Sequence, residues 1–257
     1  MRTLTLVLSL LLALPVLAAD DPRALMDSVF DRGTWQDMKG KITLTLKTRR
    51  GDTKEREIEM WSRDNEAGEA SMLMRFVAPA DVKGTAFLQI ENTGSADDRR
   101  LFLPALRRVQ RITSSGTGGN FMASDFTFYD IGMAELDDWK FTFAGEGKTK
   151  LGACKKVEGK AAEERVITET GYSKVIWCVD SEKLTVLGTE YFDKDGDRFK
   201  QLTVQAFEEL SGVPFATDML MEDLSTGHSS RMLFSGLEVN TGVDPSLFTE
   251  RALRKRR

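Results

Sequence analysis

Apolar and polar side chains alternate along most of the chain after residue 40, and this period of two constrains the fold more than any other feature. Ile42, Leu44 and Leu46, for example, are separated by threonines and followed by the turn residues Gly51 and Asp52. Alternation bounded by turn residues predicts β-strands with one buried face. The pattern recurs in the segments 41–52, 56–63, 71–79, 85–92, 139–145, 154–159, 173–180, 184–192, 198–210, 214–224 and 230–240.

Helix signals are few. Pro22 follows Asp21 in the pattern of a helix start, and apolar residues recur at helical spacing as far as Phe30. Asp244–Pro245 predicts a second, short helical turn near the other end of the chain. Many strands with few helices predict a mainly β protein, in which an antiparallel sheet must curl or be covered to bury its apolar face.

The first 18 residues predict a secretory signal peptide. Arg2 precedes the apolar run Leu4–Leu17, and Val16, Leu17 and Ala18 satisfy the small-residue cleavage rule. No later stretch is apolar enough to span a bilayer, so we expect no stable membrane insertion. The expected product is an exported, soluble domain of residues 19–257, with a net charge of −5 because Arg2 is lost from a chain of −4.

Charge and motifs argue against nucleic-acid binding and catalysis. A mildly acidic chain has no general attraction to nucleic acid. The single histidine, His228, lies in a polar turn without metal-ligand spacing, so we interpret it as a surface residue. The sequence Asp193–Gly196 is typical of a hairpin turn rather than a calcium loop. We therefore expect no catalytic residue, no cofactor and no metal.

Cys154 and Cys178 are the two cysteines of the chain, and both fall in predicted strands. In an oxidising compartment they are expected to form one structural disulfide. Two buried free thiols are the alternative.

Residues 101–112, LFLPALRRVQRI, allow two interpretations. Wound as a helix, the stretch places Arg107, Arg108 and Arg111 opposite an apolar side, which is typical of membrane-surface or nucleic-acid contact. The preceding residues, however, predict a turn and a strand, and Pro104 cannot occupy the middle of a central strand.

The region Phe76–Gly132 contains an ordered set of residues: Phe76, Pro79, Lys83–Gly84, Leu103–Arg108, Arg111–Ile112, Phe121–Phe126 and Asp130. In these residues, and more loosely in Tyr191–Asp193, Gly196 and Lys200, the chain resembles the LolA-like outer-membrane lipoprotein-sorting proteins. It places Leu103–Arg108 at a bend between two strands, and we expect that arrangement rather than a helix.

The resemblance implies an incomplete, strongly curved antiparallel β-barrel with a helical lid over an apolar cavity that accepts acyl chains. Family members are periplasmic proteins of Gram-negative bacteria that act without cofactors, often with inner-membrane transporters of the RND or MMPL type. The expected function is therefore a monomeric carrier of a lipid or lipoprotein between the two membranes. A periplasmic lipid-sensing module and, less favoured, an exported hydrolase remain alternatives.

Within that fold we expect specific residues to serve the site, although each apolar one is equally typical of core packing. The lid is expected to consist of the first helix and residues 121–132, held by Asp125 and the cluster of Arg107, Arg108 and Arg111, which could instead contact a partner. The basic residues 251–257 are expected to form a solvated tail. The expected cavity residues are Leu25, Val29, Ile42, Leu44, Leu46, Met60, Met72, Met74, Phe76, Phe121, Met122 and Phe126.

Overall fold

The structure, a computed structural model, describes residues 21–30, 35–132 and 135–255, so the predicted signal peptide lies outside the described residues. Thirteen strands form one antiparallel sheet in the order β6-β5-β4-β3-β2-β1-β13-β12-β11-β10-β9-β8-β7. Their bounds are β1 Asp37–Lys47, β2 Thr53–Asp64, β3 Ala70–Ala78, β4 Ala86–Ile90, β5 Asp98–Leu103, β6 Arg108–Ile112, β7 Trp139–Thr149, β8 Gly152–Ala161, β9 Lys174–Asp180, β10 Thr185–Phe192, β11 Arg198–Leu210, β12 Val213–Asp223 and β13 Ser229–Val239.

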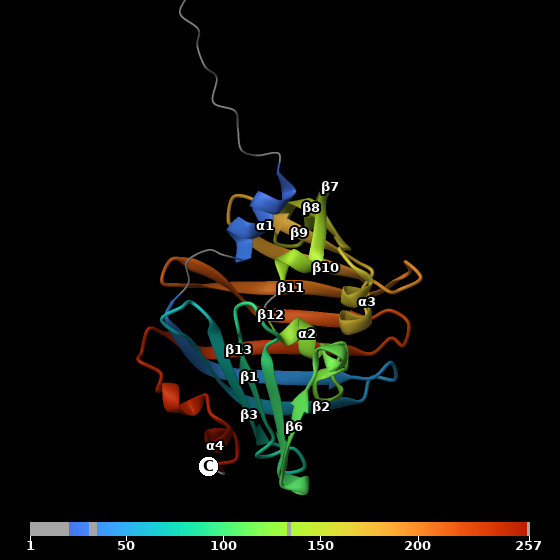
Figure 1. Ribbon diagram of the computed structural model, residues 1–257. Helices are drawn as coiled ribbons and strands as arrows, with labels where there is room; N and C mark the ends of the chain where they lie inside the picture. The colour runs from blue at the N-terminus through green and yellow to red at the C-terminus, as the bar shows by residue number, and fades with distance from the viewer. Residues whose placement is uncertain (1–20, 31–34, 133–134, 256–257) are drawn as a thin grey trace, which may run out of the picture.

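The sheet curls without closing. Strands β1 to β6 and β7 to β13 each pair in sequence order, and β1 joins the two runs by pairing with β13 as well as β2. Among the described residues, neither β6 nor β7 has a strand on its outer side. Figure 1 shows the sheet curving around α2, with β3 and β6 in front and β11 to β13 behind. The prediction of a mainly β, incomplete barrel is confirmed.

Helices contribute little to the described chain. The predicted first helix is present as α1, Pro22–Phe30, and it packs against β7 at the upper end of Figure 1. The other α-helices are α2 Phe128–Ile131, α3 Glu164–Thr170 and α4 Glu250–Leu253. Short 3-10 turns are η2 Pro104–Leu106, η3 Ser114–Gly116, η4 Phe121–Ala123, η5 Leu136–Asp138 and η6 Pro245–Leu247. Helices long and apolar enough to span a bilayer are absent from the described part of the chain.

The alternation of side chains divides the buried residues into two clusters, one on each face of the sheet. In β4, Phe87 belongs to the concave core, while Ala86 and Leu88 belong to a smaller cluster on the outer face. Because this strand is covered on both sides, it is apolar at nearly every position. The concave core is the larger cluster and includes most of the methionines and aromatic residues.

The C-terminal residues cover the outer face of β3 to β5, and the prediction of a solvated tail is wrong for part of this segment. Leu253 is fully buried against Leu73 and Phe102. The buried Arg75 donates to the backbone oxygens of Ala252 (2.8 Å) and Lys255 (2.7 Å). The segment is ordered because apolar burial and a buried guanidinium, which must be hydrogen-bonded, act at the same place.

Two further predictions are confirmed. Residues 101–112 form the end of β5, the turn η2 and β6, with Arg107 in the left-handed region (φ 49°), so the stretch is a hairpin and not a long helix. Cys154 of β8 and Cys178 of β9 form the expected disulfide.

Candidate functional site

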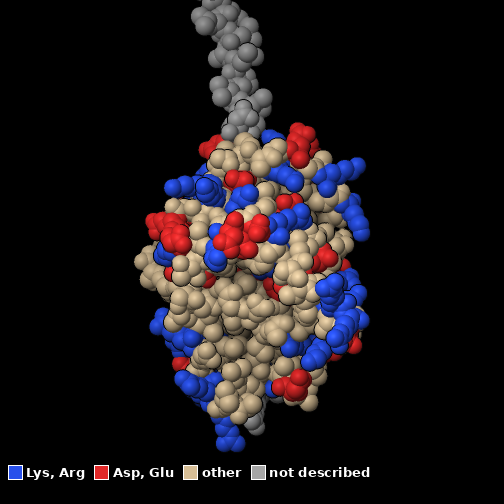
Figure 2. Space-filling view, turned by 90° about the vertical axis from the view of Figure 1, so that its right-hand side faces the viewer, with Lys and Arg blue, Asp and Glu red and all other residues tan. Residues whose placement is uncertain are grey.

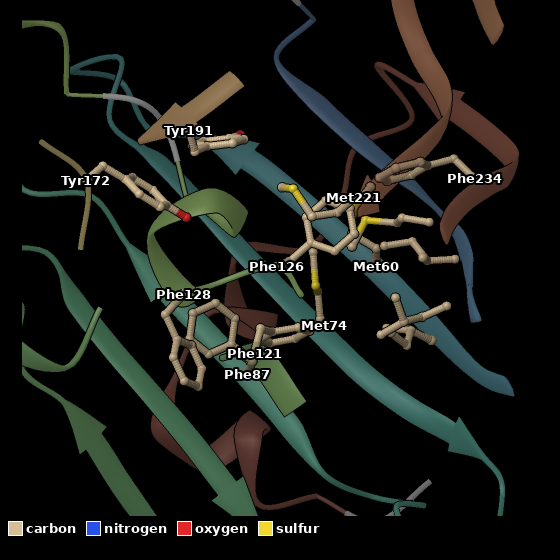
Figure 3. Packing of buried hydrophobic residues seen from close by; sticks show 14 of the residues in the cluster. Met60, Met74, Phe87, Phe121, Phe126, Phe128, Tyr172, Tyr191, Met221 and Phe234 are labelled. Atoms are coloured by element: carbon tan, nitrogen blue, oxygen red, sulfur yellow. The ribbon is translucent and has the colours of Figure 1, made fainter. Parts of the chain in front are cut away.

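The floor of the concave face is built from methionine and aromatic side chains on neighbouring strands. Met60 of β2 lies opposite Met74 of β3, and Met74 lies opposite Phe87 of β4. Figure 3 shows Met60 and Met74 beside Met221 and Phe126 in the middle of this core. Met is flexible and polarizable, so such a floor adapts to irregular apolar neighbours.

The chain between β6 and α2 crosses this floor, and we call residues 113–132 the inner segment. Phe121 is fully buried, and its ring centroid lies 5.5 Å from that of Phe87, 5.6 Å from that of Phe128 and 6.0 Å from that of Phe76. Edge-to-face and tilted ring pairs at this separation stabilise packing beyond the area that they bury. The inner segment is therefore docked into the concave face by its aromatic residues.

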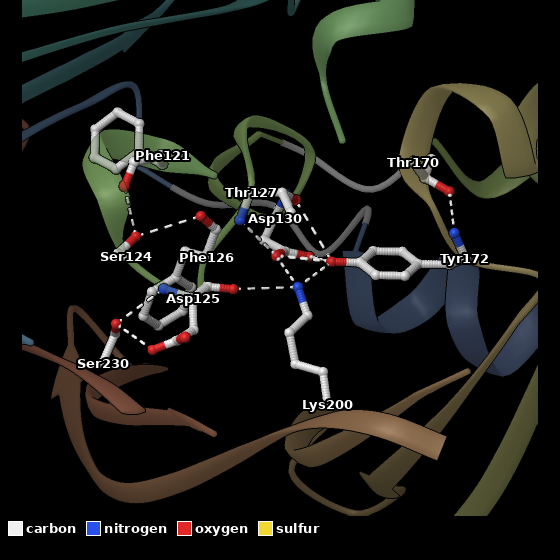
Figure 4. Close-up of polar contacts among 10 residues, drawn as sticks. All are labelled: Phe121, Ser124, Asp125, Phe126, Thr127, Asp130, Thr170, Tyr172, Lys200 and Ser230. Atoms are coloured by element: carbon white, nitrogen blue, oxygen red, sulfur yellow. Dashed lines mark hydrogen bonds and ion pairs between the residues drawn. The ribbon is translucent and has the colours of Figure 1, made fainter. Parts of the chain in front are cut away.

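Buried hydrogen bonds also hold the inner segment to strand β11. Lys200 Nζ of β11 donates to Asp130 Oδ2 (2.8 Å) and to the backbone oxygen of Asp125 (3.2 Å), and it also bonds the hydroxyl of Tyr172. Tyr172 in turn donates to the Asp130 carboxylate at 3.0 Å (Figure 4). Burial and the Asp130 charge hold the pKa of Tyr172 well above its ordinary value, so the hydroxyl stays protonated. We call Asp130, Tyr172 and Lys200 the polar latch.

A second polar contact lies next to the latch. Ser230 Oγ of β13 donates to Asp125 Oδ2 (2.6 Å) and accepts from the Asp125 backbone N–H (2.9 Å). His228 Nδ1 lies 2.8 Å from the same carboxylate, and the His228 side chain is 27% exposed. The histidine is therefore partly buried and hydrogen-bonded, which corrects its interpretation as a plain surface residue. Both groups bind Asp125 directly, and the serine is not hydrogen-bonded to the imidazole as a catalytic triad requires.

The backbone of the inner segment is strained at its centre. Met122 (φ 49°) and Ala123 (φ 59°) occupy the left-handed region consecutively, which residues with a Cβ rarely adopt. Arg56 of β2 donates to the carbonyl oxygen of Met122 and helps to hold this conformation. Strain of this kind costs about 1–3 kcal/mol per residue and persists only where surrounding contacts enforce it.

An apolar cavity of about 470 Å³ lies beside α2 and the end of α1. Strands β2 to β4 line one side of it and strands β10 to β12 line the other. Its size falls within the range of about 300–1,000 Å³ that is typical of small-molecule pockets. Three expected cavity residues, Val29, Met60 and Met72, line it. Its other apolar lining residues are Phe30, Trp35, Met38, Ala70, Ile131, Val186, Leu202, Val204, Phe215, Ala216 and Met219.

The remaining expected residues lie elsewhere. Leu25 packs against the concave core, and Met122 packs there at the strained turn. Arg107 and Arg108 are exposed at the end of the β5–β6 hairpin, whereas Asp125 is buried against Ser230 and His228, so the structure does not bring the arginines to Asp125. The Arg111 guanidinium lies 3.9 Å from the Asp98 carboxylate.

The other expected cavity residues are packed in the concave core and do not line the cavity. They are Ile42, Leu44, Leu46, Met74, Phe76, Phe121 and Phe126.

Sequence reasoning did not identify Trp35, Phe215 or Met219 as cavity residues, nor Lys200 as a binding partner of the inner segment. Lys200 carried a signal, since it is a lysine at an inward position of an alternating strand, between Phe199 and Leu202. A buried lysine needs a carboxylate partner. The identity of that partner, 70 positions away, had no local signal.

A more polar hollow of about 440 Å³ lies beside the latch, where Tyr172 and Lys200 meet α3 and the β10–β11 turn. Figure 2 shows the face at the right of Figure 1, with acidic and basic side chains mixed over its upper part and uncharged side chains across its middle. The hollow has charged residues of both signs in its lining, including Glu164 and Lys194. It is thus a poorer match for an acyl chain than the cavity beside α2.

Comparisons with known proteins agree with this arrangement. A family model whose description is that of an uncharacterized protein matches residues 68–255. A LolA superfamily protein from Nitrosomonas europaea shares the fold with a TM-score of 0.67, at 17% identity over 90% of this chain and 97% of that one. The chain belongs to the family of the matching model, and its fold is LolA-like.

Two solved structures are more similar to this LolA-like protein. One, from Vibrio parahaemolyticus, is named as an outer membrane lipoprotein-sorting protein domain; it is 28% identical, with a TM-score of 0.83, over 91% of this chain and 98% of that one. The other is a DUF1329 family protein from Desulfovibrio piger, 26% identical with a TM-score of 0.83, over 90% of this chain and 97% of that one. No curated protein matches the chain in sequence.

Proposed function

We propose that this LolA-like protein is a periplasmic carrier that covers the acyl chains of a lipid or lipoprotein and moves them between the inner and outer membranes. The observation that carries the proposal is the apolar cavity of about 470 Å³ between α1, α2 and the curved sheet. The LolA-like fold supports it. So does the 28% identity to a structure named for outer membrane lipoprotein sorting.

The physical need for such a carrier is large. A sixteen-carbon chain exposed to water costs about 12 kcal/mol, at about 0.8 kcal/mol per methylene. A cavity with apolar and adaptable walls removes most of this cost without requiring polar specificity. Met60, Met72 and Met219 provide such walls on three strands.

In this proposal α1 and the inner segment form the lid. Both border the cavity, through Phe30 and Ile131 respectively. The lid opens when the polar latch and the Asp125–Ser230 contact break, and the strain at Met122 and Ala123 lowers the cost of that step. Release then needs only an acceptor that binds the cargo better than the closed cavity does.

We further propose that the protein acts as a monomer, without a cofactor and without catalysis, and that it receives or delivers cargo at an inner-membrane transporter of the RND or MMPL type. The exposed Arg107 and Arg108 at the hairpin end, with Arg111 beside them, are the proposed partner contact.

The test is transfer of a fluorescent diacyl lipid between donor and acceptor vesicles. Ala216→Trp fills the cavity, because Ala216 lines it on β12. Ala206→Trp introduces the same side chain at an exposed position of the neighbouring strand β11. Transfer by the wild type and by Ala206→Trp, with at least tenfold slower transfer by Ala216→Trp, supports the proposal. Equal transfer by all three, or none by the wild type, contradicts it.

A further inference from the structure

The cavity beside α2 ends where the inner segment covers the floor of the sheet. On β3, Met72 lines the cavity, whereas Met74, the next inward residue, is packed in the concave core. Phe126 of the inner segment lies beside Met74 in that core (Figure 3). Ile131, also of the inner segment, lines the cavity itself. The position of the inner segment therefore sets how far the cavity extends along the strands.

The volume of the cavity corresponds to one acyl chain. A methylene group is close in size to a water molecule, whose share of liquid volume is about 30 Å³, so a cavity of about 470 Å³ holds about fifteen methylenes. A second chain of that length needs as much space again. The polar hollow beside the latch does not offer it, because charged side chains such as Glu164 and Asp193 are in its lining, and covering them with an acyl chain is costly.

The concave face has apolar surface for a further chain, but the inner segment covers it. Phe121 and Phe128 pack on Phe87 of β4, with the ring centroids 5.5 Å apart in each pair. Leu44 of β1 and Phe76 of β3 are fully buried in the same core. Side chains of the inner segment thus take up the apolar floor into which the cavity would otherwise continue.

The attachments of the inner segment oppose its displacement, and its backbone strain favours it. The attachments include the contacts of Lys200 with Asp130 (2.8 Å) and of Ser230 with Asp125 (2.6 Å). The strain lies at Met122, whose φ of 49° is in the left-handed region. Part of the cost of displacement is therefore already present in the closed form.

We infer that the closed protein holds a single acyl chain of about fifteen methylenes, and that cargo with two or more chains binds by displacing the inner segment. This inference rests on the proposed carrier function and adds the class of cargo to it. A single-chain lipid gains nothing from opening, because its chain is already covered in the closed form. A second chain stays in water until the inner segment moves, and its burial provides the free energy for that step.

A series of lysophosphatidylcholines of increasing chain length tests the depth of the cavity. Binding should strengthen about fourfold for each added methylene, the equivalent of about 0.8 kcal/mol, and should level off at about fifteen carbons. Ile131→Ala removes the side chain beyond Cβ from the cavity lining, so binding should go on strengthening for about three more carbons. Ile167→Ala makes the same change on α3, beside the polar hollow, and should level off where the wild type does.

Hydrogen–deuterium exchange of the inner segment tests its displacement. Saturating dodecanoyl lysophosphatidylcholine should leave the exchange of residues 121–131 within about twofold of that in the free protein. Phosphatidylcholine with two dodecanoyl chains, presented as vesicles, should speed it at least tenfold, because the backbone hydrogen bonds from Phe121 to Phe126 and from Ile131 to Thr127 then break. The central strand β11 is the internal control, and its exchange should not change.

Three results overturn the inference and leave the carrier proposal intact. One is affinity of the wild type that keeps rising well beyond the predicted chain length. Another is an Ile131→Ala series that levels off where the wild type does. The third is phosphatidylcholine that fails to bind, or that binds without faster exchange of the inner segment. Failure of every chain length in both lipid classes contradicts the carrier proposal itself.

Discussion

Lys200 of β11 lies 2.8 Å from Asp130 of α2, and each of these side chains is only 5% exposed. The pair ties the inner segment, which emerges from one edge of the sheet, to a strand on the opposite wall. Because a buried charge is costly unless it is paired, the contact favours one position of the inner segment strongly over others.

Replacing Lys200 with Met should destabilise the protein by about 3–5 kcal/mol, because it leaves the Asp130 carboxylate buried without its cation. Urea unfolding followed by circular dichroism measures this loss. Adding Asp130→Leu should recover part of it, since the unpaired charge is then gone. Lys156→Met is the control, because its partner Glu190 is partly exposed at 3.5 Å and such pairs contribute at most about 1 kcal/mol. A loss for Lys200→Met no larger than that of the control would contradict the role of the latch.

Asp125→Ala should speed both uptake and release of an acyl probe in stopped-flow fluorescence. The substitution leaves Ser230 and His228 without their shared acceptor and frees one attachment of the inner segment. Asp125→Asn retains an oxygen that can accept from Ser230 and should change the rates less. If uptake and release are unchanged in Asp125→Ala, the contact does not control the lid.

The pH dependence of stability should include a contribution from Asp37. Burial raises the pKa of Asp37, but hydrogen bonds from the backbone N–H groups of Thr241, Gly242 and Val243 outweigh this and leave the pKa below its ordinary value. A carboxyl whose folded pKa is lowered stabilises the protein above its unfolded pKa, and this stability is lost as the pH falls through the folded pKa.

Asp37→Asn should therefore be less stable than the wild type at pH 6, with the difference shrinking toward pH 3. Urea unfolding at several pH values measures the difference. Asp52→Asn, at an exposed turn, is the control and should run parallel to the wild type. The difference in stability between Asp37→Asn and the wild type could instead stay constant from pH 6 to pH 3. That result would show that the ionised Asp37 carboxylate does not stabilise the protein.

The hairpin end should matter for delivery rather than for binding. Leu106 is 67% exposed between Pro104 and the exposed pair Arg107 and Arg108. The hairpin that leads into β6 ends at the lower end of the molecule in Figure 1. Arg107→Glu with Arg108→Glu should leave affinity for an acyl probe within about twofold and slow lipid transfer to anionic vesicles at least fivefold, through charge repulsion. The same change at Arg49 and Arg50, in the β1–β2 turn, is the control and should have little effect. Equal slowing by both pairs would indicate a general charge effect and not a contact.

The strands and the hairpin end could be predicted because their signals are local. An alternation such as Ile42, Leu44, Leu46 fixes which face of a strand is buried, and Pro104 excludes a continuous central strand. The curvature of the sheet followed from the family resemblance, since alternation alone does not distinguish a curled sheet from a flat one with a covered face.

Which inward residues meet the cavity could not be predicted. Leu44 and Met60 both occupy inward positions on neighbouring strands, yet Leu44 is packed in the core and Met60 lines the cavity. The difference depends on where the inner segment lies, and its position is set by contacts such as Lys200 with Asp130 that join distant parts of the chain. The expected contact of Asp125 with the arginines assumed closeness in sequence, whereas Asp125 binds Ser230 and His228, more than 100 positions away.

Native mass spectrometry of the protein, purified without detergent from the periplasm of cells that express it, tests acyl-chain binding most directly. A carrier should retain one molecule per chain whose mass and fragments identify acyl groups. Ala216→Trp should lack this molecule, and Ala206→Trp should keep it. Repeatedly empty wild-type protein, or equal retention by Ala216→Trp and the wild type, would contradict acyl-chain binding in the cavity between α1, α2 and the sheet.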